Sequence, residues 1–476
     1  MTSTLDTAGP LHRFLVAPRR VPPLDPGFRP AALARAAFEA SLQQSAMRVP
    51  VTLAVEQPGG IADVRGTWVL PDGDPGAAAS YAFAERLAKS MLWAFGGFRL
   101  WVDGPAGLAV HLRRHYADAP TGRFDAATLG ETVFGRPFEI EAAQRDEFPS
   151  IRVATSTLGG HLDGCRIGFD LGASDRKAAA VIDGEVVFSE EIAWDPGHHA
   201  DPQWHVDQIM DSLRRAAAHL PRVDAIGGSA AGVYVDNEIR VASLFRSVPP
   251  DVFRARVPGL FGELQAAWGG IPFVVLNDGD VTALAGSMVA KVGGLLGIAM
   301  GSSEAAGYIT PDGRLTSWLN ELAFVPIDLA PEAAVDDWSG DRGCGSQYFS
   351  QQALRRLLPA AGIDVEPGTA LPEQLLLLQA LIAADDPRAR RVYETIGTEL
   401  GYALLEYRTL YDVENVLLLG RLMSGPGGDV VTASAIEALR AEDPAAAERL
   451  AFHSVSERDK RHGQAVAAAS LPALEG

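Results

Sequence analysis

The pattern of apolar residues from residue 165 onward predicts strands that alternate with helices. Short apolar runs bounded by turn residues such as Asp183-Gly184 are typical of strands. In residues 204–220 the apolar side chains recur at the spacing of one helical face, which predicts a helix. In chain order, the predicted elements of this block are strands 165–170, 177–183 and 185–192, helix 204–220, strand 223–228, a helix within 252–268, strand 272–276 and helix 281–292.

The same alternation continues through the C-terminal part of the chain, which begins with an apolar run ending in glycine. The predicted elements are strands 294–301 and 305–310, helices 344–358, 371–384 and 388–411, strand 416–419 and helices 433–439 and 445–450. Because strands alternate with helices in both blocks, each is predicted to be of the α/β class.

The N-terminal region has a mixed pattern without that alternation. Its first 30 residues contain six prolines and predict an extended arm. The predicted elements that follow are helix 31–47, strands 49–56 and 62–70, helix 80–95, strand 98–102 and helix 107–116. No chemical motif is recognised here. The charged and polar segment 141–157 is predicted to be the linker to the next block.

Composition narrows the class of protein. With 476 residues the chain is long enough for two or three domains of average size. Asp and Glu number 60 against 41 Lys and Arg, so the formal net charge is −19. That acidity argues against a nucleic-acid or anionic membrane surface as partner, although a local basic pocket for a phosphate stays compatible with it.

The cysteine content and the absence of targeting patterns point to one compartment. Only Cys165 and Cys344 are present, too few for a disulfide framework or a cysteine-rich zinc site. The start of the chain lacks a signal-peptide pattern, and no apolar run reaches the roughly 18 residues of a membrane span. The sequence therefore predicts a cytoplasmic protein without a membrane partner.

The first candidate site follows the strand 165–170. In Ile167-Gly-Phe-Asp-Leu-Gly-Ala-Ser174, Asp170 closes the strand and a turn of small residues leads toward Lys177. Such a turn brings backbone amides and a hydroxyl close to an anion, and the carboxylate can hold magnesium directly or through water. Taken alone, an ordinary hairpin with an aspartate at the strand end is at least as good an interpretation.

The second candidate site is Val274-Val-Leu-Asn-Asp-Gly-Asp280, where a strand runs into a helix. In open α/β sheets, ligands bind at the carboxyl ends of the strands. Asp278 there can accept a proton from a substrate hydroxyl. Either aspartate can instead cap the helix; we favour the cap for Asp280 and function for Asp278.

Two glycine-containing turns complete the candidate set. Met300-Gly-Ser-Ser-Glu-Ala-Ala-Gly307 joins two predicted strands in the manner of a phosphate loop. Leu417-Leu-Leu-Gly420, followed by Gly425-Pro-Gly-Gly428, can let a nucleoside approach the backbone. An ordinary loop is the simpler interpretation of each alone. Neither a Walker A loop nor a dinucleotide-binding glycine motif occurs, so P-loop and Rossmann folds are disfavoured.

These segments, in this order, resemble the ROK family of bacterial sugar kinases, within the sugar kinase/actin superfamily. The resemblance runs from about Arg166 to Asp429. The matching segments are Asp170-Leu-Gly-Ala-Ser174, Ile226-Gly-Gly-Ser-Ala-Ala-Gly232, Leu276-Asn-Asp-Gly-Asp280, Gly301-Ser-Ser-Glu-Ala-Ala-Gly307 and Asn320-Glu-Leu-Ala-Phe-Val-Pro326. The ordered set is specific, whereas no single motif is decisive.

The resemblance implies a fold and a division into domains. The fold is a two-lobed actin-like ATPase (ribonuclease H-like) α/β fold with an added N-terminal α+β region. The implied parts are an N-terminal extension over 1–155, whose role the sequence leaves open, a first lobe over 156–292 and a second lobe with C-terminal helices over 293–476.

The resemblance also implies an ATP-dependent carbohydrate kinase, a phosphotransferase that uses ATP and Mg²⁺ on a hydroxyl of a sugar-like small molecule. Asp278 corresponds to the catalytic base and Asp170 to the residue that positions magnesium. Asn277 and Glu321 correspond to acceptor-binding residues. The implied phosphate and ATP contacts are Gly172, Ser174, Lys177, Gly301, Ser302 and Gly420.

The chain departs from the family pattern where zinc is bound. Phe324 replaces the motif histidine, and in Asp337-Trp-Ser-Gly-Asp-Arg-Gly-Cys344 only the last zinc cysteine is kept. We therefore expect no structural zinc, and we expect Cys344 to be a small buried residue. Ser346 replaces an acidic sugar ligand. Glu304 adds a carboxylate to the second phosphate loop, which would repel a polyphosphate unless it faced away or met a metal.

Two other functions stay open at this stage. A non-catalytic relative that binds a sugar or a protein partner would explain the altered sugar and zinc positions. A transcription repressor would require a winged helix and a basic face, and residues 1–140 show no helix-turn-helix pattern, so no nucleic-acid partner is expected. A homodimer is the family habit. The sequence leaves the oligomeric state and the identity of the acceptor open.

Overall fold

The computed structural model describes residues 9–151, 155–156, 159–454 and 457–474. The chain forms two compact units, the first composed of Met1–Val153, Ile298–Ala306 and Trp318–Phe452, the second of Ala154–Gly297, Gly307–Ser317 and His453–Gly476. The N-terminal region thus shares a unit with most of the C-terminal part of the chain.

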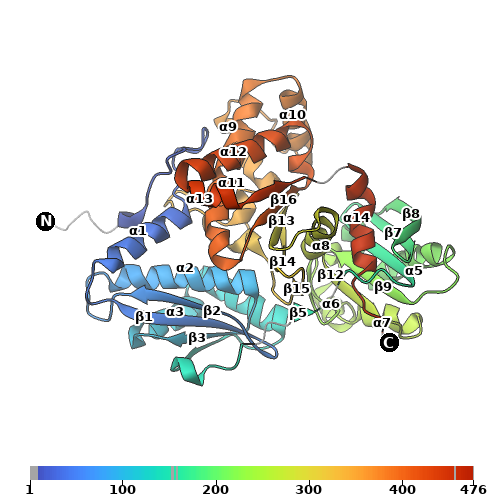
Figure 1. Ribbon diagram of the computed structural model, residues 1–476, viewed down its shortest axis with the longest axis horizontal. Coiled ribbons are helices and arrows are strands. Elements are labelled where there is room, and N and C mark those ends of the chain that lie inside the picture. Colours follow the sequence, from blue (N-terminus) through green and yellow to red (C-terminus); the bar gives the residue numbers. More distant parts are fainter. Residues whose placement is uncertain (1–8, 152–154, 157–158, 455–456, 475–476) are drawn as a thin grey trace. The chain divides into compact units, whose positions relative to one another are not determined.

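The N-terminal region of the first unit is built on a four-stranded sheet with the order β2-β1-β3-β4 (Figure 1). Strand β1 pairs antiparallel with β2 and β3, and β3 pairs parallel with β4. The elements are α1 (Ala31–Gln43), β1 (Val49–Gln57), β2 (Gly60–Val69), α2 (Ala77–Phe95), β3 (Arg99–Asp103), α3 (Ala106–Asp118), α4 (Pro120–Ala126) and β4 (Glu139–Ala142). The two strands, two helices and third strand predicted for this region up to residue 102 are therefore confirmed.

The rest of the first unit is largely helical. Its helices and strand are α9 (Leu354–Ala360), α10 (Leu371–Ala383), α11 (Pro387–Leu410), β16 (Asn415–Leu419), α12 (Pro426–Glu442) and α13 (Pro444–Arg449). The predicted helix 344–358 is wrong in its first half. Two 3₁₀ turns, Gly345–Gln347 and Gln351–Ala353, precede α9, because Ser350 adopts an extended conformation and its hydroxyl accepts a hydrogen bond from the Gln352 amide.

The second unit has a five-stranded sheet with the order β12-β9-β6-β7-β8. Strands β12, β9 and β6 are parallel, and β7 and β8 continue antiparallel as the predicted hairpins. The elements are β6 (Cys165–Leu171), β7 (Asp175–Ile182), β8 (Glu185–Ala193), α5 (Pro202–Ala217), β9 (Ala225–Ala230), β10 (Val233–Val235), β11 (Glu238–Val241), α6 (Pro250–Arg256), α7 (Leu260–Ala267), β12 (Phe273–Asn277), α8 (Asp278–Ala290) and α14 (Glu457–Ala469).

Helix α14 packs directly on this sheet and was not predicted (Figure 1). Gly168 and Gly227 are register partners on neighbouring strands. A Cβ atom at either glycine would lie 1.7 Å from a carbonyl oxygen of α14. The two glycines therefore let the helix backbone lie against the sheet, a packing that any side chain would prevent.

A third sheet has the strand order β17-β16-β13-β14-β15-β5. The boundary between the two units falls within β13 and β14. The bounds of its remaining strands are β17 (Ala451–His453), β13 (Leu295–Met300), β14 (Glu304–Ile309), β15 (Leu315–Thr316) and β5 (Thr155–Ser156).

Candidate functional site

Three neighbouring parallel strands of the second unit end beside polar side chains. Asp170 on β6 is register partner of Ser229 on β9, and the Ser229 hydroxyl donates to Asp170 Oδ1 at 2.8 Å. Asp278 directly follows the third strand, β12, as the first residue of α8. The structure thus brings together the two aspartates that the sequence singled out, because parallel strands end at one edge of a sheet.

Lys177 supplies the positive charge of this edge. It faces Asp170 across the β6–β7 pair, with Nζ 3.3 Å from Asp170 Oδ2 and 2.9 Å from Asp175 Oδ1. Burial would lower the pKa of Lys177, but the two carboxylates outweigh it and raise that pKa. Burial raises the pKa of Asp170, although Lys177 and Ser229 oppose the rise.

The turn between β6 and β7 is closed by its own hydrogen bonds. The Gly172 amide donates to the Asp175 carbonyl at 2.9 Å. The Trp194 indole donates to the Gly172 carbonyl at 2.7 Å. Ser174, at the exposed tip, donates to Asp175 Oδ2 at 3.0 Å. Of the predicted phosphate contacts in this turn, the Ser174 hydroxyl lies at the surface while the Gly172 amide is used to close the turn.

Asp278 is the most perturbed carboxyl group of this edge. Burial, and secondarily the charge of Asp170, raise its pKa to about 6. The Gly279 amide donates to its Oδ1 at 3.0 Å. A carboxylate with this pKa is mostly ionised at neutral pH yet a stronger base than an ordinary aspartate, which suits proton abstraction from a hydroxyl.

Asn277 caps helix α8, a role that the sequence predicts for Asp280. Helix α8 begins at Asp278, three residues before the predicted start, so Asn277 is its N-cap and Asp280 lies inside the first turn. The expectation that Asp280 caps the helix is therefore wrong. The Asn277 side chain accepts from the Gly279 amide at 2.7 Å and donates to the Gly232 carbonyl at 2.6 Å.

Three residues that sequence reasoning did not single out complete the edge. Ser229 lies on β9, in the Gly-Gly-Ser part of the segment 226–232. Gln464 on α14 donates to the Ser229 hydroxyl at 3.1 Å. The Tyr234 hydroxyl donates to the Ala231 carbonyl at 3.0 Å, and burial and the nearby Asp278 raise its pKa. Gln464 carried no sequence signal, because its helix was not predicted.

The first unit holds the remaining predicted residues. Gly301 and Ser302 form the turn between β13 and β14, in which the Gly301 amide donates to the Ser303 carbonyl at 3.0 Å and Ser302 is exposed. Gly420 follows β16 with a φ of 98°. A Cβ atom there would lie 2.5 Å from the carbonyl oxygen of Met300, so glycine is required for the close approach of the two chain segments.

Glu304 points into the interior of the first unit. Its side chain is buried, its Oε1 accepts from the Tyr407 hydroxyl at 3.3 Å, and a Cβ atom at Gly345 would lie 2.3 Å from its Oε2. Burial, and secondarily Glu321, raise its pKa to about 8, although Tyr407 opposes the rise. At pH 7 the carboxyl group is therefore mostly protonated, and it does not place a negative charge in the loop.

The segment that resembles a zinc motif is held by a carboxylate. Asp336 accepts from the Ser339 amide at 2.7 Å, the Ser339 hydroxyl at 2.8 Å and the Ser346 hydroxyl at 2.9 Å. Phe324 stacks on Trp93 with 4.1 Å between ring centroids. Cys344 is buried, and burial raises its pKa to about 12. Glu321, just before this segment, is half-buried and donates its amide to the Trp93 carbonyl at 3.0 Å.

Within the residues that the structure describes, no cluster of three or more His, Cys, Asp and Glu side chains is arranged to hold a metal ion. No helix in the same residues combines the length and apolar character needed to cross a membrane.

Comparison with known proteins identifies the fold. No family model and no curated protein matches the sequence significantly. A ROK hexokinase from Thermus thermophilus matches with TM-score 0.50 and 21% identity, over 64% of this chain and 97% of the hexokinase. A ROK family transcriptional regulator, a homologue of the E. coli MLC protein, matches with TM-score 0.51 and 20% identity, over 65% of this chain and 79% of the regulator.

These similarities confirm the predicted fold class. The chain has the α/β, actin-like ATPase fold that ROK sugar kinases and ROK transcriptional regulators share. At this level of identity the similarity concerns the fold, because related folds host different functions and function depends on the residues of the site.

Proposed function

We propose that this protein is a ROK-family kinase that transfers a phosphoryl group from ATP to a hydroxyl group of a sugar or sugar-like small molecule. The observation that carries the proposal is Asp278. It follows strand β12 at the edge where Asp170 ends β6, and its pKa is raised to about 6. A base of this strength at the carboxyl end of a parallel strand suits deprotonation of an alcohol during phosphoryl transfer.

Asn277 and Asp278 have different roles in the proposed proton transfer. Asn277 caps α8 through the Gly279 amide, and so holds the start of the helix on which Asp278 lies. The Gly279 amide also donates to Asp278 Oδ1, which leaves Oδ2 to accept the proton of the acceptor hydroxyl. In this proposal Asn277 acts on the acceptor chiefly by positioning Asp278, and Glu321 binds acceptor hydroxyls.

The residues at Asp170 fit Mg²⁺ that arrives with a nucleotide. Magnesium keeps several waters and binds through one or two carboxylates plus substrate phosphates, so no all-protein cage is required. The charge of Asp170 raises the pKa of Asp278, a like-charge repulsion that a cation would relieve. When bound, Mg²⁺ neutralises charge on the transferred phosphoryl group. Ser229 orients Asp170 for this role, and Lys177 opposes the rise of its pKa that burial causes.

Phosphate binding is assigned to the six residues that the sequence indicated. Ser174, Lys177 and Ser302 would supply a hydroxyl, an ammonium and a hydroxyl to phosphates, and Gly172, Gly301 and Gly420 would permit close backbone approach. Because Glu304 is buried and mostly protonated, it does not repel a polyphosphate bound at the Ser302 turn. ATP and Mg²⁺ are therefore the proposed cosubstrate and cofactor.

An assay with ATP, Mg²⁺ and a broad panel of sugars tests the proposal. Asp278→Asn keeps the shape of the side chain and removes the base, so turnover should fall by about 10²-fold or more. Asp207→Asn, on the exposed face of α5, is the matched control and should leave turnover unchanged. Absence of turnover with every acceptor, or turnover that survives Asp278→Asn, would refute the kinase.

A second candidate function is a non-catalytic relative that binds a sugar or a partner. Two side chains in the expected sugar and zinc region favour it. Ser346 donates to Asp336, and Phe324 stacks on Trp93. Both side chains are thus engaged inside the protein. Calorimetry with an ATP analogue and with sugars separates the two functions: nucleotide binding supports the kinase, and sugar binding without nucleotide binding supports the relative.

A further inference from the structure

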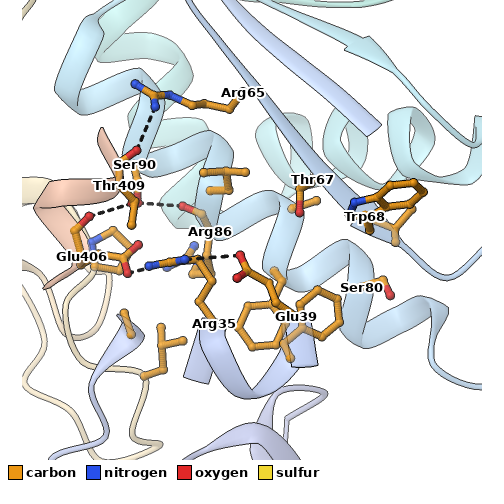
Figure 2. A pocket seen from close by; sticks show the side chains of 18 of the residues that line it. Arg35, Glu39, Arg65, Thr67, Trp68, Ser80, Arg86, Ser90, Glu406 and Thr409 are labelled. Atoms are coloured by element: carbon orange, nitrogen blue, oxygen red, sulfur yellow. Dashed lines mark hydrogen bonds and ion pairs between the residues drawn. The ribbon is translucent and has the colours of Figure 1, made fainter. Parts of the chain in front are cut away.

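A cavity of about 240 Å³ lies in the first unit between the N-terminal region and helix α11 (Figure 2). Its walls come from α1, β2 and α2, with Glu406 and Thr409 of α11 closing one side. None of the residues assigned above to phosphoryl transfer lines it. The proposed phosphoryl transfer therefore does not account for this cavity.

One part of the wall is apolar and aromatic. Phe38 of α1 and Phe83 of α2 stack with 4.3 Å between ring centroids and 22° between ring planes. Leu87 and Leu329 extend this surface. Apolar and aromatic walls of this kind contribute most of the contact area in small-molecule sites.

Two of the three arginines at the cavity pair with carboxylates that do not line it. Arg65 binds Asp63 at 2.6 Å and donates to the carbonyls of Thr409 and Leu410. Arg86 binds Glu85 at 2.7 Å and a second carboxylate, Asp341, at 2.8 Å. Their charges are neutralised by these partners, so neither offers a free cation to a ligand.

The charges that remain at the cavity sum to minus one. Arg35 extends between two carboxylates, with Nε 3.3 Å from Glu406 and Nη1 3.3 Å from Glu39 (Figure 2). One guanidinium against two carboxylates disfavours an anionic ligand such as a phosphate ester. The same three groups offer donors and acceptors side by side.

Hydroxyl groups add further polar positions to the wall. Ser80 is fully buried, and its Oγ accepts from the Leu70 amide at 3.0 Å. Thr67 of β2 lines the cavity and also a second hollow of about 490 Å³. Trp68, 46% exposed, and Glu39 line both hollows as well, so the two hollows adjoin at Trp68. Arg48 lines only the second hollow, where it lies over the Trp68 ring, 4.9 Å from the ring centroid.

We propose that this cavity binds a neutral polyhydroxylated small molecule of about the size of a monosaccharide. Each hydroxyl of such a ligand both donates and accepts, which matches a rim that contains one guanidinium, two carboxylates and the Thr67 hydroxyl. Its apolar ring face matches Phe38 and Phe83. Because Glu406 lies on α11 and Glu39 on α1, a bound ligand couples the N-terminal region to α11, and α1, β2 and α2 form part of a ligand-binding unit.

Hydrogen exchange of the full-length protein, read by mass spectrometry, tests the proposal. The probes are neutral monosaccharides and polyols, their phosphorylated counterparts, and primary amines of similar size. We expect a neutral polyol to slow exchange in peptides covering 31–43 and 60–69. Asp278→Asn should leave this protection intact, so the result is independent of whether the protein is a kinase.

Conservative variants assign the protection to the cavity. Thr67→Val removes a hydroxyl group and Glu39→Gln replaces a charged acceptor by a neutral amide, in both cases without loss of bulk, and each should weaken the apparent affinity about tenfold. Glu131→Gln, an exposed residue of the same region, is the matched control and should have no effect. Thermal melting shows whether each variant is folded. If one variant has a lowered melting temperature, the other is used for the test.

Three results would overturn the proposal. The first is that no neutral polyol protects the two segments. The second is protection that Thr67→Val and Glu39→Gln leave unchanged. The third is stronger protection by a phosphate ester or an amine than by any neutral polyol, which would assign a different ligand class to the cavity.

Discussion

Lys89 of α2 forms an ion pair with Asp341, with Nζ 3.1 Å from a carboxylate oxygen, and so ties the N-terminal region to the segment that resembles a zinc motif. Lys89 is fully buried and also binds Asp125 at 2.9 Å. The Trp93 indole donates to Asp125 at 2.9 Å. In this chain, buried ion pairs from the N-terminal region hold the segment 336–346 from one side.

Lys89→Met should destabilise the protein by about 3 kcal/mol or more, because it leaves Asp125 without its ammonium partner in the interior. Urea unfolding measures the change. Arg114→Met is the matched control: it breaks the Arg114–Asp118 pair, whose side chains are 82% and 72% exposed, and should change stability by less than about 1 kcal/mol. Equal effects of the two variants would contradict this role of Lys89.

Asp278 should limit the stability of the protein at neutral pH. Its folded-state pKa of about 6 lies above the ordinary 3.8, so ionisation costs free energy in the folded state. This cost is absent below about pH 4, grows as the pH rises to 6 and is constant above it. Asp278→Asn should therefore be more stable than wild type at pH 7, by roughly 3 kcal/mol. Denaturant unfolding at pH 4 and pH 7 should show the difference shrinking in acid.

The same group predicts the pH dependence of catalysis, if the protein is the proposed kinase. Protonation of Asp278 removes the base, so kcat/KM should fall tenfold per pH unit below about pH 6 and level off above it. A pH–rate profile with a working acceptor measures this. A profile that is flat between pH 5 and pH 7 would assign the proton transfer to another group.

The pKa of Glu304 predicts how nucleotide binding changes at alkaline pH. Its pKa of about 8 keeps the carboxyl group mostly neutral at pH 7, and it ionises above pH 8. An ATP analogue should thus bind wild type and Glu304→Gln equally at pH 7, and wild type more weakly at pH 9. Calorimetry at both pH values tests this. Weaker binding to wild type already at pH 7 would mean that Glu304 is charged there.

Gln464 and Ser229 should support the magnesium requirement of the proposed reaction. Ser229→Ala removes the hydrogen bond to Asp170, which raises the pKa of that carboxyl further and weakens its hold on a cation. We expect the Mg²⁺ concentration for half-maximal rate to rise about tenfold, and by a smaller factor in Gln464→Leu. Gln203→Leu on α5 is the matched control. An unchanged Mg²⁺ requirement in Ser229→Ala would remove Ser229 from the site.

The sequence anticipated features that depend on neighbouring residues. The strands before Asp170 and Asp278 were predicted from local apolar runs, and the structure has them as β6 and β12. Their shared sheet edge followed from the general rule that parallel strands end together. The cap of α8 was misassigned because Asn277 and Asp280 both have side chains that can cap, and only the observed hydrogen bond to the Gly279 amide distinguishes them.

What the sequence by itself determined is therefore most of the order of elements, the α/β class and the two aspartates at strand ends, because these depend on periodicity and on residues close in the chain. Tertiary structure alone decided three other features. Gln464 reaches Ser229 across 235 positions, Lys89 meets Asp341 across 252, and Arg35 meets Glu406 across 371. Such contacts exist only once the chain has packed, and their burial sets both the pKa values and the cavity.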